Sequence, residues 1–176
     1  TGDFAGDLLY RTLAKFGFTT GIYGADADDG FSLKGARVTN AVRCVPHENK
    51  PSGYEIAACR PFLAAEIAAL PRLKAILALG TIAHDSVLAA EGARRSAHRF
   101  AHGARHRLLS GRRLLDSYHC SRYNTNTGKL TENMFAAVIA ATRKDLKRIL
   151  AYSTVSHLGV MMLALGLGQV ALAVFH

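Results

Sequence analysis

The stretch that decides the fold is residues 73–90, which reads LKAILALGTIAHDSVLAA. Residues 73–79 form a largely apolar run that Gly80 closes, a pattern typical of a buried strand in a parallel sheet. Residues 81–90 then predict a helix directly after this strand. A buried strand that leads into a helix is a recurring unit of α/β domains. The segment therefore predicts an α/β fold with a mostly parallel sheet.

The flanking segments continue this alternation. Residues 36–42 (ARVTNAV) and 113–118 (RLLDSY) predict two further strands, and the polar segment 119–130 predicts a loop. The predicted helices are residues 3–18, residues 56–70 and a helix that Thr131 caps and that runs to about residue 143 or beyond. Ligands of such sheets bind at the carboxyl ends of the strands, so we expect the chemistry in the loops after these strands.

The chain is basic, with a formal net charge of +9. Such a balance favours an anionic partner, nucleic acid before a membrane surface. The charge concentrates between Glu91 and Arg113, where Glu91 is the only acid. The cations there are Arg94, Arg95, Arg99, Arg105, Arg107, Arg112 and Arg113, with His98, His102 and His106 among them. A solvated arginine-rich face and a nucleic-acid contact surface explain this run equally well.

Residues 158–175 differ from everything before them, because they carry no charge and Gln169 is their only strongly polar side chain. Their length and composition reach the lower limit for a membrane-spanning helix. Lys144, Lys147 and Arg148 precede them, as positive flanks often do. A buried core helix is the alternative, and we favour a membrane-derived segment.

The most informative motif is residues 116–131, DSYHCSRYNTNTGKLT. A predicted strand delivers His119 to its carboxyl end, and a polar loop follows at once. Arginine, tyrosine and asparagine side chains can donate to phosphates, stack on bases and read base edges. This loop is therefore a candidate nucleic-acid site.

Residues 119–125 (HCSRYNT) closely resemble the second motif of type-5 uracil-DNA glycosylases. Three more blocks resemble that family in order: residues 1–9, residues 38–46 and the Phe-x-His-Gly of residues 100–103. The resemblance covers about residues 1–143. It implies a three-layer α/β/α sandwich around a four-stranded parallel sheet. It also implies an enzyme that flips a deaminated base out of DNA and hydrolyses its N-glycosidic bond.

The same resemblance implies roles for individual residues. His119 matches the histidine that hydrogen-bonds the departing base, Asn40 the asparagine that reads the base edge, and Asp3 an aspartate that positions water near the sugar. The expected substrate-binding residues are Asn40, His119, Arg122, Tyr123 and Asn124. The alternative for His119 is a structural role, and that for Asn40 is an ordinary position at a strand end. The alternative for Asp3 is an N-cap of the first helix.

Three cysteines are present, and their odd number argues against a secreted disulfide framework and favours a cytoplasmic protein. In the family, four cysteines hold a [4Fe-4S] cluster, and Cys44 and Cys59 match two of them by spacing. The other two ligands are absent from this chain, so we expect the cluster to be incomplete or absent. Buried core thiols are the alternative for both residues, and Cys120 belongs to the histidine motif.

Two departures from the family predict an impaired enzyme. The chain opens without a methionine or a signal peptide, and the family's first, glycine-rich motif is missing, so we expect an N-terminally truncated domain. Residues 145–176 resemble a transmembrane segment of antiporter-like complex I and cation antiporter subunits, in which Lys147 and His157 match positions on a proton path. We therefore predict a partial glycosylase-like domain, residues 1–143, and a foreign apolar tail, residues 144–176.

Two classes of function follow. The first is a DNA-repair glycosylase that acts on uracil or another deaminated base. The second is a non-catalytic DNA-binding remnant or a membrane-tethered fragment of a chimeric gene, whereas an antiporter subunit explains the tail alone. The expected partner is DNA that contains deaminated bases. No obligate protein partner is expected, and membrane contact is expected only through residues 144–176.

Overall fold

A computed structural model describes residues 4–26, 28–43 and 51–156. The chain divides into two compact units, one made of residues 1–37 with 119–176 and the other of residues 38–118. Asp3, Cys44 and the apolar segment 158–175 lie outside the described residues, so the expectations placed on them stay predictions.

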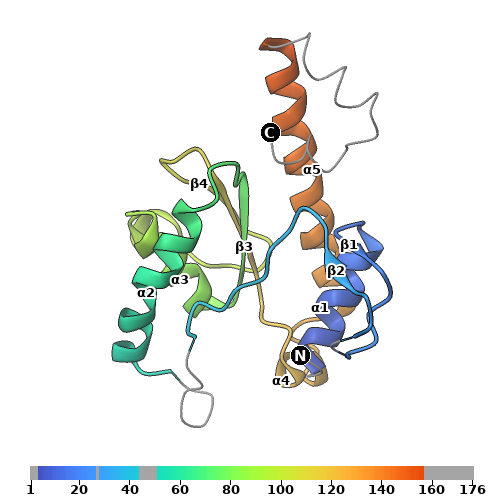
Figure 1. Ribbon diagram of the computed structural model, residues 1–176. Helices are drawn as coiled ribbons and strands as arrows, with labels where there is room; N and C mark the ends of the chain where they lie inside the picture. The colour runs from blue at the N-terminus through green and yellow to red at the C-terminus, as the bar shows by residue number, and fades with distance from the viewer. Residues whose placement is uncertain (1–3, 27, 44–50, 157–176) are drawn as a thin grey trace. The chain divides into compact units, whose positions relative to one another are not determined.

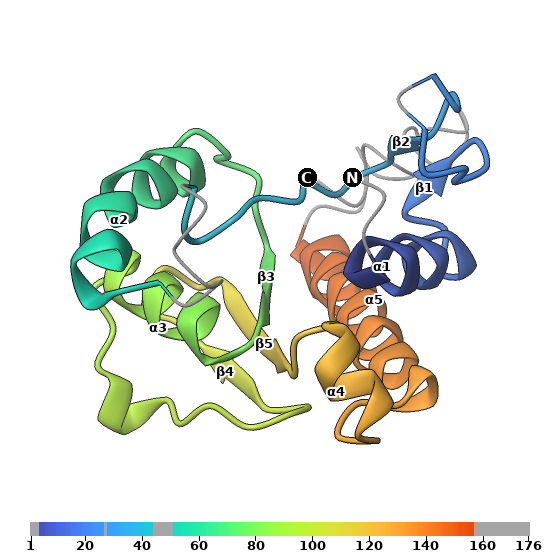
Figure 2. The ribbon, with the colours of Figure 1, turned by 90° about the horizontal axis from the view of Figure 1, so that it is seen from below.

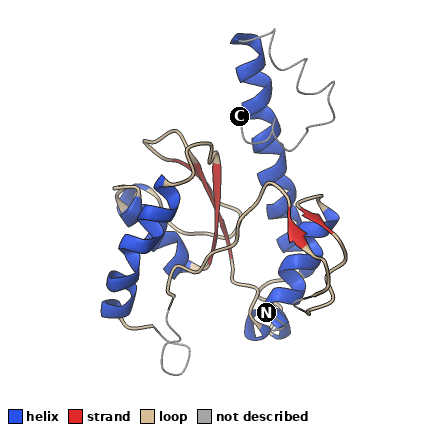
Figure 3. Ribbon diagram, in the orientation of Figure 1, coloured by secondary structure: helices blue, strands red, loops and turns tan. Residues whose placement is uncertain are grey.

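The unit of residues 38–118 contains a three-stranded sheet in the order β3-β5-β4. Strands β3 (Ala75–Leu79) and β5 (Arg113–Ser117) pair in parallel, in register from Ala75 opposite Arg113 to Leu79 opposite Ser117. This confirms two of the three predicted strands and their parallel pairing. Strand β4 (Arg105–Arg107) pairs with β5 antiparallel. The described sheet is therefore mixed (Figure 3), which corrects the expectation of a mostly parallel one.

The antiparallel strand arises from a tight turn between β4 and β5. The N–H of Leu108 donates to the Arg112 carbonyl at 2.9 Å, and Gly111 lies in the left-handed region with φ 82°. Glycine adopts this conformation without steric cost, so a Ser-Gly pair suits the turn.

Two helices of this unit pack against each other on one side of the sheet, as Figures 1 and 2 show. Helix α2 (Gly53–Ala68) begins with a capping box between Ser52 and Glu55, and helix α3 (Thr81–Ala90) follows β3 through Gly80. The buried core between helices and sheet consists of Leu63, Ile67, Ala78, Val87, Leu88, Leu108 and Leu114. A short 3-10 helix, η2 (Arg95–Ala97), lies in the arginine-rich segment.

The other unit is built around two helices that contact each other, α1 (Phe4–Lys15) and α5 (Glu132–Ser156). Thr131 caps α5 as predicted, because its hydroxyl accepts the N–H of Met134 at 3.2 Å. Between the helices, β1 (Thr19–Thr20) pairs antiparallel with β2 (Ser32–Leu33). The buried apolar residues of this unit include Leu13, Leu130, Phe135, Val138 and Ile139. A short helix, α4 (Arg122–Asn126), interrupts the segment predicted as a loop.

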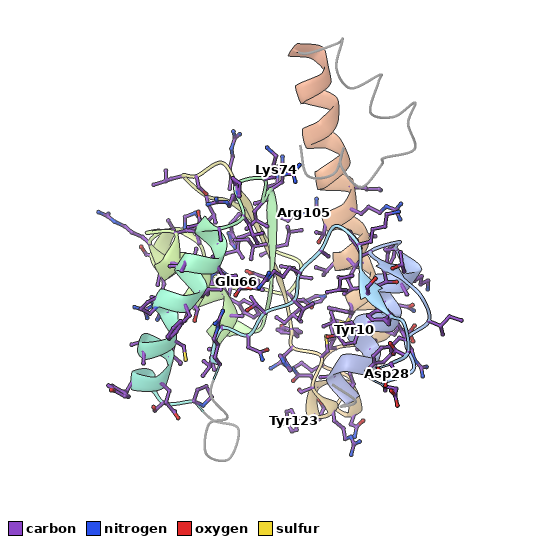
Figure 4. The ribbon with its side chains drawn as sticks, in the orientation of Figure 1. Tyr10, Asp28, Glu66, Lys74, Arg105 and Tyr123 are labelled. Carbon is purple, nitrogen blue, oxygen red and sulfur yellow. The ribbon has the colours of Figure 1, made fainter. Side chains whose placement is uncertain are left out.

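The predicted strand of residues 36–42 is wrong, because that segment is irregular. Thr39 of this segment and the adjoining Arg43 bond to helix α2 instead. The Thr39 hydroxyl donates to Glu66 at 2.7 Å, and the Arg43 guanidinium donates to the same carboxylate at 2.9 Å. Figure 4 labels Glu66, which projects from α2. The alternating pattern thus reflects a segment held along a helix and not one paired in a sheet.

Candidate functional site

His119 follows strand β5 and begins a turn that the motif itself fixes. Its side chain is exposed, whereas the neighbouring Cys120 is buried. Ser121 caps α4, with its hydroxyl accepting the N–H of Asn124 at 3.4 Å. The Asn124 side-chain amide in turn donates to the His119 carbonyl at 2.9 Å. The motif therefore folds as strand, turn and short helix, and the exposed histidine follows the last residue of β5 by two positions in the sequence.

Helix α4 presents two of the predicted binding residues. Arg122 is exposed, and Tyr123 is 74% exposed and projects from the helix (Figure 4). Asn124 is half-buried, and its amide holds the His119 backbone. The structure thus shows Asn124 in a positioning contact, while the substrate contact expected of it stays a prediction.

The Phe-x-His-Gly block of residues 100–103 lies against the end of β5. The N–H of Tyr118 donates to Nδ1 of His102 at 3.2 Å, and the two rings stack with centroids 5.0 Å apart. Gly103 has φ 79° and donates its N–H to the Asp116 carbonyl at 2.8 Å, so glycine suits this position. This block therefore fixes the backbone of the residue that directly precedes His119.

Asn40 is exposed on the irregular segment beside α2 and does not stand at a strand end. It belongs to the unit of residues 38–118, whereas His119 belongs to the other unit. Their meeting at one base therefore stays a prediction.

The arginine-rich segment combines exposed cations with paired ones. Arg94, Arg95 and Arg99 are exposed, although Arg95 also lies 3.3 Å from Asp85. Arg112 forms an ion pair with Glu91 at 2.8 Å. Exposed arginines thus lie around η2, and Arg105 and Arg107 on β4 are also exposed, whereas Arg112 is held in a structural pair.

The cysteines do not make a four-thiolate site. Cys59 is buried on α2, and its sulfur accepts the N–H of Arg43 at 3.4 Å, next to the position of Cys44 in the sequence. Cys120 belongs to the other unit, and burial raises the pKa of its thiol to about 12. With three cysteines in the sequence, the residues present do not fit a [4Fe-4S] cluster.

A buried polar network escaped the sequence analysis. His84 of α3 and His106 of β4 both contact the carboxylate of Asp116 on β5. These residues are far apart in sequence, and no local pattern links them. The parallel pairing of β3 with β5 and the antiparallel turn bring them together.

Among the helices that the structure describes, none is both long enough and apolar enough to cross a membrane. Helix α5 nevertheless continues as one helix through residues 143–145, where the sequence changes character.

Comparison with known proteins supports both resemblances inferred from the sequence. The model of the uracil DNA glycosylase superfamily matches residues 2–143. A model described as "NADH:quinone oxidoreductase/Mrp antiporter, TM" matches residues 127–176. The chain is also similar to NADH-ubiquinone oxidoreductase chain 5 of Patiria pectinifera, with 48% identity over 69 residues, 36% of this chain and 10% of that protein. The resemblance of the C-terminal segment to antiporter-like subunits is thereby confirmed.

Two relatives illustrate the match over the larger part. The type-5 uracil-DNA glycosylase of Thermus thermophilus is 43% identical over 144 residues, 82% of this chain and 65% of the relative. That of Mycobacterium bovis is 38% identical over 146 residues, 82% of this chain and 54% of the relative. The chain thus spans less than two thirds of the length of either relative. Over residues 2–143, with its α/β fold and mixed sheet, the chain belongs to the uracil DNA glycosylase superfamily.

Proposed function

We propose that this chain is a DNA-repair glycosylase that hydrolyses the N-glycosidic bond of uracil, or of another deaminated base, in DNA. The observation that carries the proposal is the placement of His119. It is an exposed histidine just beyond the carboxyl end of β5, on a turn that Ser121 and Asn124 fix. The relatives that share this segment are named type-5 uracil-DNA glycosylases.

The reaction needs a donor aimed at the leaving base, because negative charge grows there as the glycosidic bond breaks while the sugar becomes cationic. An exposed imidazole on a fixed backbone can supply that donor. We assign Asn40 to reading the base edge, since an amide offers both a donor and an acceptor. The resemblance assigns Asp3 to positioning the attacking water.

DNA binding is assigned to two sets of exposed residues. Arg94, Arg95 and Arg99 offer charges to phosphates around η2. Arg122 and Tyr123 on α4 offer a further charge and an aromatic face on which a base can stack. The same arginines support the second candidate, a non-catalytic DNA-binding protein, because they would bind DNA without any chemistry at His119.

Three structural expectations accompany this function. A helical layer on the sheet face opposite α2 and α3 would complete a three-layer sandwich. Cys44 and Cys59 would face one site without completing a cluster, because the chain has only three cysteines. The tail of residues 144–176 would take no part in base excision.

A single-turnover assay on the chain of residues 1–176 tests the function. A duplex with one uracil is incubated with excess protein, and abasic sites are cleaved and counted, beside an otherwise identical duplex with thymine. Release from the uracil duplex alone supports the proposal. Binding to both duplexes without release would overturn it in favour of the DNA-binding candidate.

A further inference from the structure

Four nitrogen and oxygen donor atoms converge in the unit of residues 38–118. Nδ1 of His84 lies 2.8 Å from Oδ1 of Asp116, and Nε2 of His106 lies 3.0 Å from Oδ2 of the same carboxylate. The side chains of His84 and Asp116 are 1% and 0% exposed, and that of His106 is 12% exposed. One ligand atom from each residue lies within 4.8 Å of the others. The three residues come from α3, β4 and β5, far apart in the sequence.

The hydrogen bonds of His84 fix the orientation of its ring. Nε2 of His84 lies 2.8 Å from the carbonyl oxygen of His98, and a carbonyl can only accept, so Nε2 carries the hydrogen in this contact. The other ring nitrogen, Nδ1, faces the Asp116 carboxylate at 2.8 Å. Nδ1 is therefore the ring atom that is placed to coordinate a cation together with this carboxylate.

We propose that these residues form a mononuclear site for a divalent transition metal of the Zn²⁺ class. Two imidazole nitrogens and both carboxylate oxygens supply four donor atoms of the kind that zinc accepts. A bound metal would replace the hydrogen bonds that the two imidazoles make with the Asp116 carboxylate. The bond from Nε2 of His84 to a backbone carbonyl is the outer contact that histidine ligands of metals usually make.

The proposed metal links α3 and β4 to the central strand β5. Phe100 covers the ring of His84 edge-on at 5.6 Å, so that side of the site is apolar, whereas His106 is the more accessible ligand. The site also anchors the arginine-rich segment, because His84 bonds to the carbonyl of His98, a residue of that segment. This inference is independent of the proposed function, and a catalytically inactive chain would bind the metal equally well.

The test is a titration of metal-free chain with Co²⁺, followed by its visible absorption, with Zn²⁺ as competitor. Cys44 and Cys59 are replaced by serine throughout, because thiolates would bind the same ions. We expect one Co²⁺ per chain, displaced by one Zn²⁺, and a higher Tm in the presence of Zn²⁺. Asp116→Asn keeps the size of the side chain and should weaken binding by at least about 100-fold, the upper end of the cost of losing even an outer partner.

His98→Ala is the matched control, because it removes a neighbouring imidazole but keeps the carbonyl that bonds His84. It should bind Co²⁺ like the parent chain. Absence of 1:1 binding by the parent would overturn the proposal, and so would equal binding by Asp116→Asn. Circular dichroism verifies that each variant is folded. If Asp116→Asn does not fold, the titration and the Zn²⁺-dependent Tm of the parent decide alone.

Discussion

Removing the exposed arginines around η2 should change how DNA binding depends on salt. Each phosphate that a cation neutralises contributes about 0.9 to the slope of log affinity against log salt concentration. Replacing Arg94, Arg95 and Arg99 with alanine should therefore lower the slope by about 2.7 if each contacts one phosphate. Arg95 is 63% exposed but also paired with Asp85. Its contribution is smaller, so we expect a decrease between about 1.8, for two full contacts, and about 2.7, for three.

The corresponding affinity loss follows from the same relation. Between about 50 and 200 mM salt, a slope lower by about 1.8 to 2.7 means that the parent loses roughly 12- to 42-fold more affinity than the variant. Fluorescence anisotropy of a labelled duplex, titrated at several salt concentrations, measures both slopes. A variant with Arg11, Lys15 and Lys34 replaced by alanine loses the same charge from other exposed positions. Equal effects in both triple variants would refute a localised contact surface.

Three further predictions concern stability, reactivity and the tail. Ser52→Ala removes the capping box of α2 and should lower the free energy of unfolding by about 1 kcal/mol in a denaturant titration. Cys120 should resist alkylation until the chain unfolds, as mass spectrometry of labelled peptides would show. Burial raises the pKa of this thiol to about 12 in the folded chain, so the unfolded chain loses the proton first, and stability should fall as pH rises from about 8.5 towards that value. Deleting residues 145–176 should leave DNA affinity unchanged in the anisotropy titration, and a loss in a folded variant would show that the tail contributes.

Local patterns predicted the elements whose structure depends on local sequence. The apolar run closed by Gly80 gave β3, and α3 has the predicted bounds of residues 81–90. The strand predicted for residues 36–42 was wrong because the alternating pattern of this segment fits a strand as well as the irregular structure. The residue that bonds Thr39, Glu66, is distant in the sequence, so no local pattern reveals it. Strand β4 is short and polar, and the turn at Gly111 was the signal that could have revealed it.

The candidate site likewise has some features that local sequence predicted and others that it could not predict. The strand, the turn and the polar segment around His119 could be predicted from one contiguous motif, and the structure shows the histidine exposed, shortly after the end of β5 in the sequence. The contacts that hold this motif in place could not be predicted, because the hydrogen bond between His102 and Tyr118 joins residues that only the fold brings together. The network around Asp116 was missed for the same reason, since its histidines belong to different elements.

The most direct test of the proposed chemistry is single-turnover uracil excision by His119→Ala beside the parent chain of residues 1–176. Leu109→Ala, which alters a side chain that is 95% exposed, serves as the control. Loss of one donor to developing charge costs on the order of 100- to 1,000-fold in rate. DNA affinity should stay nearly unchanged, because we assign it mainly to the exposed arginines and to Tyr123. We predict that His119→Ala slows excision by this factor at parental affinity; excision at the parental rate would contradict the account.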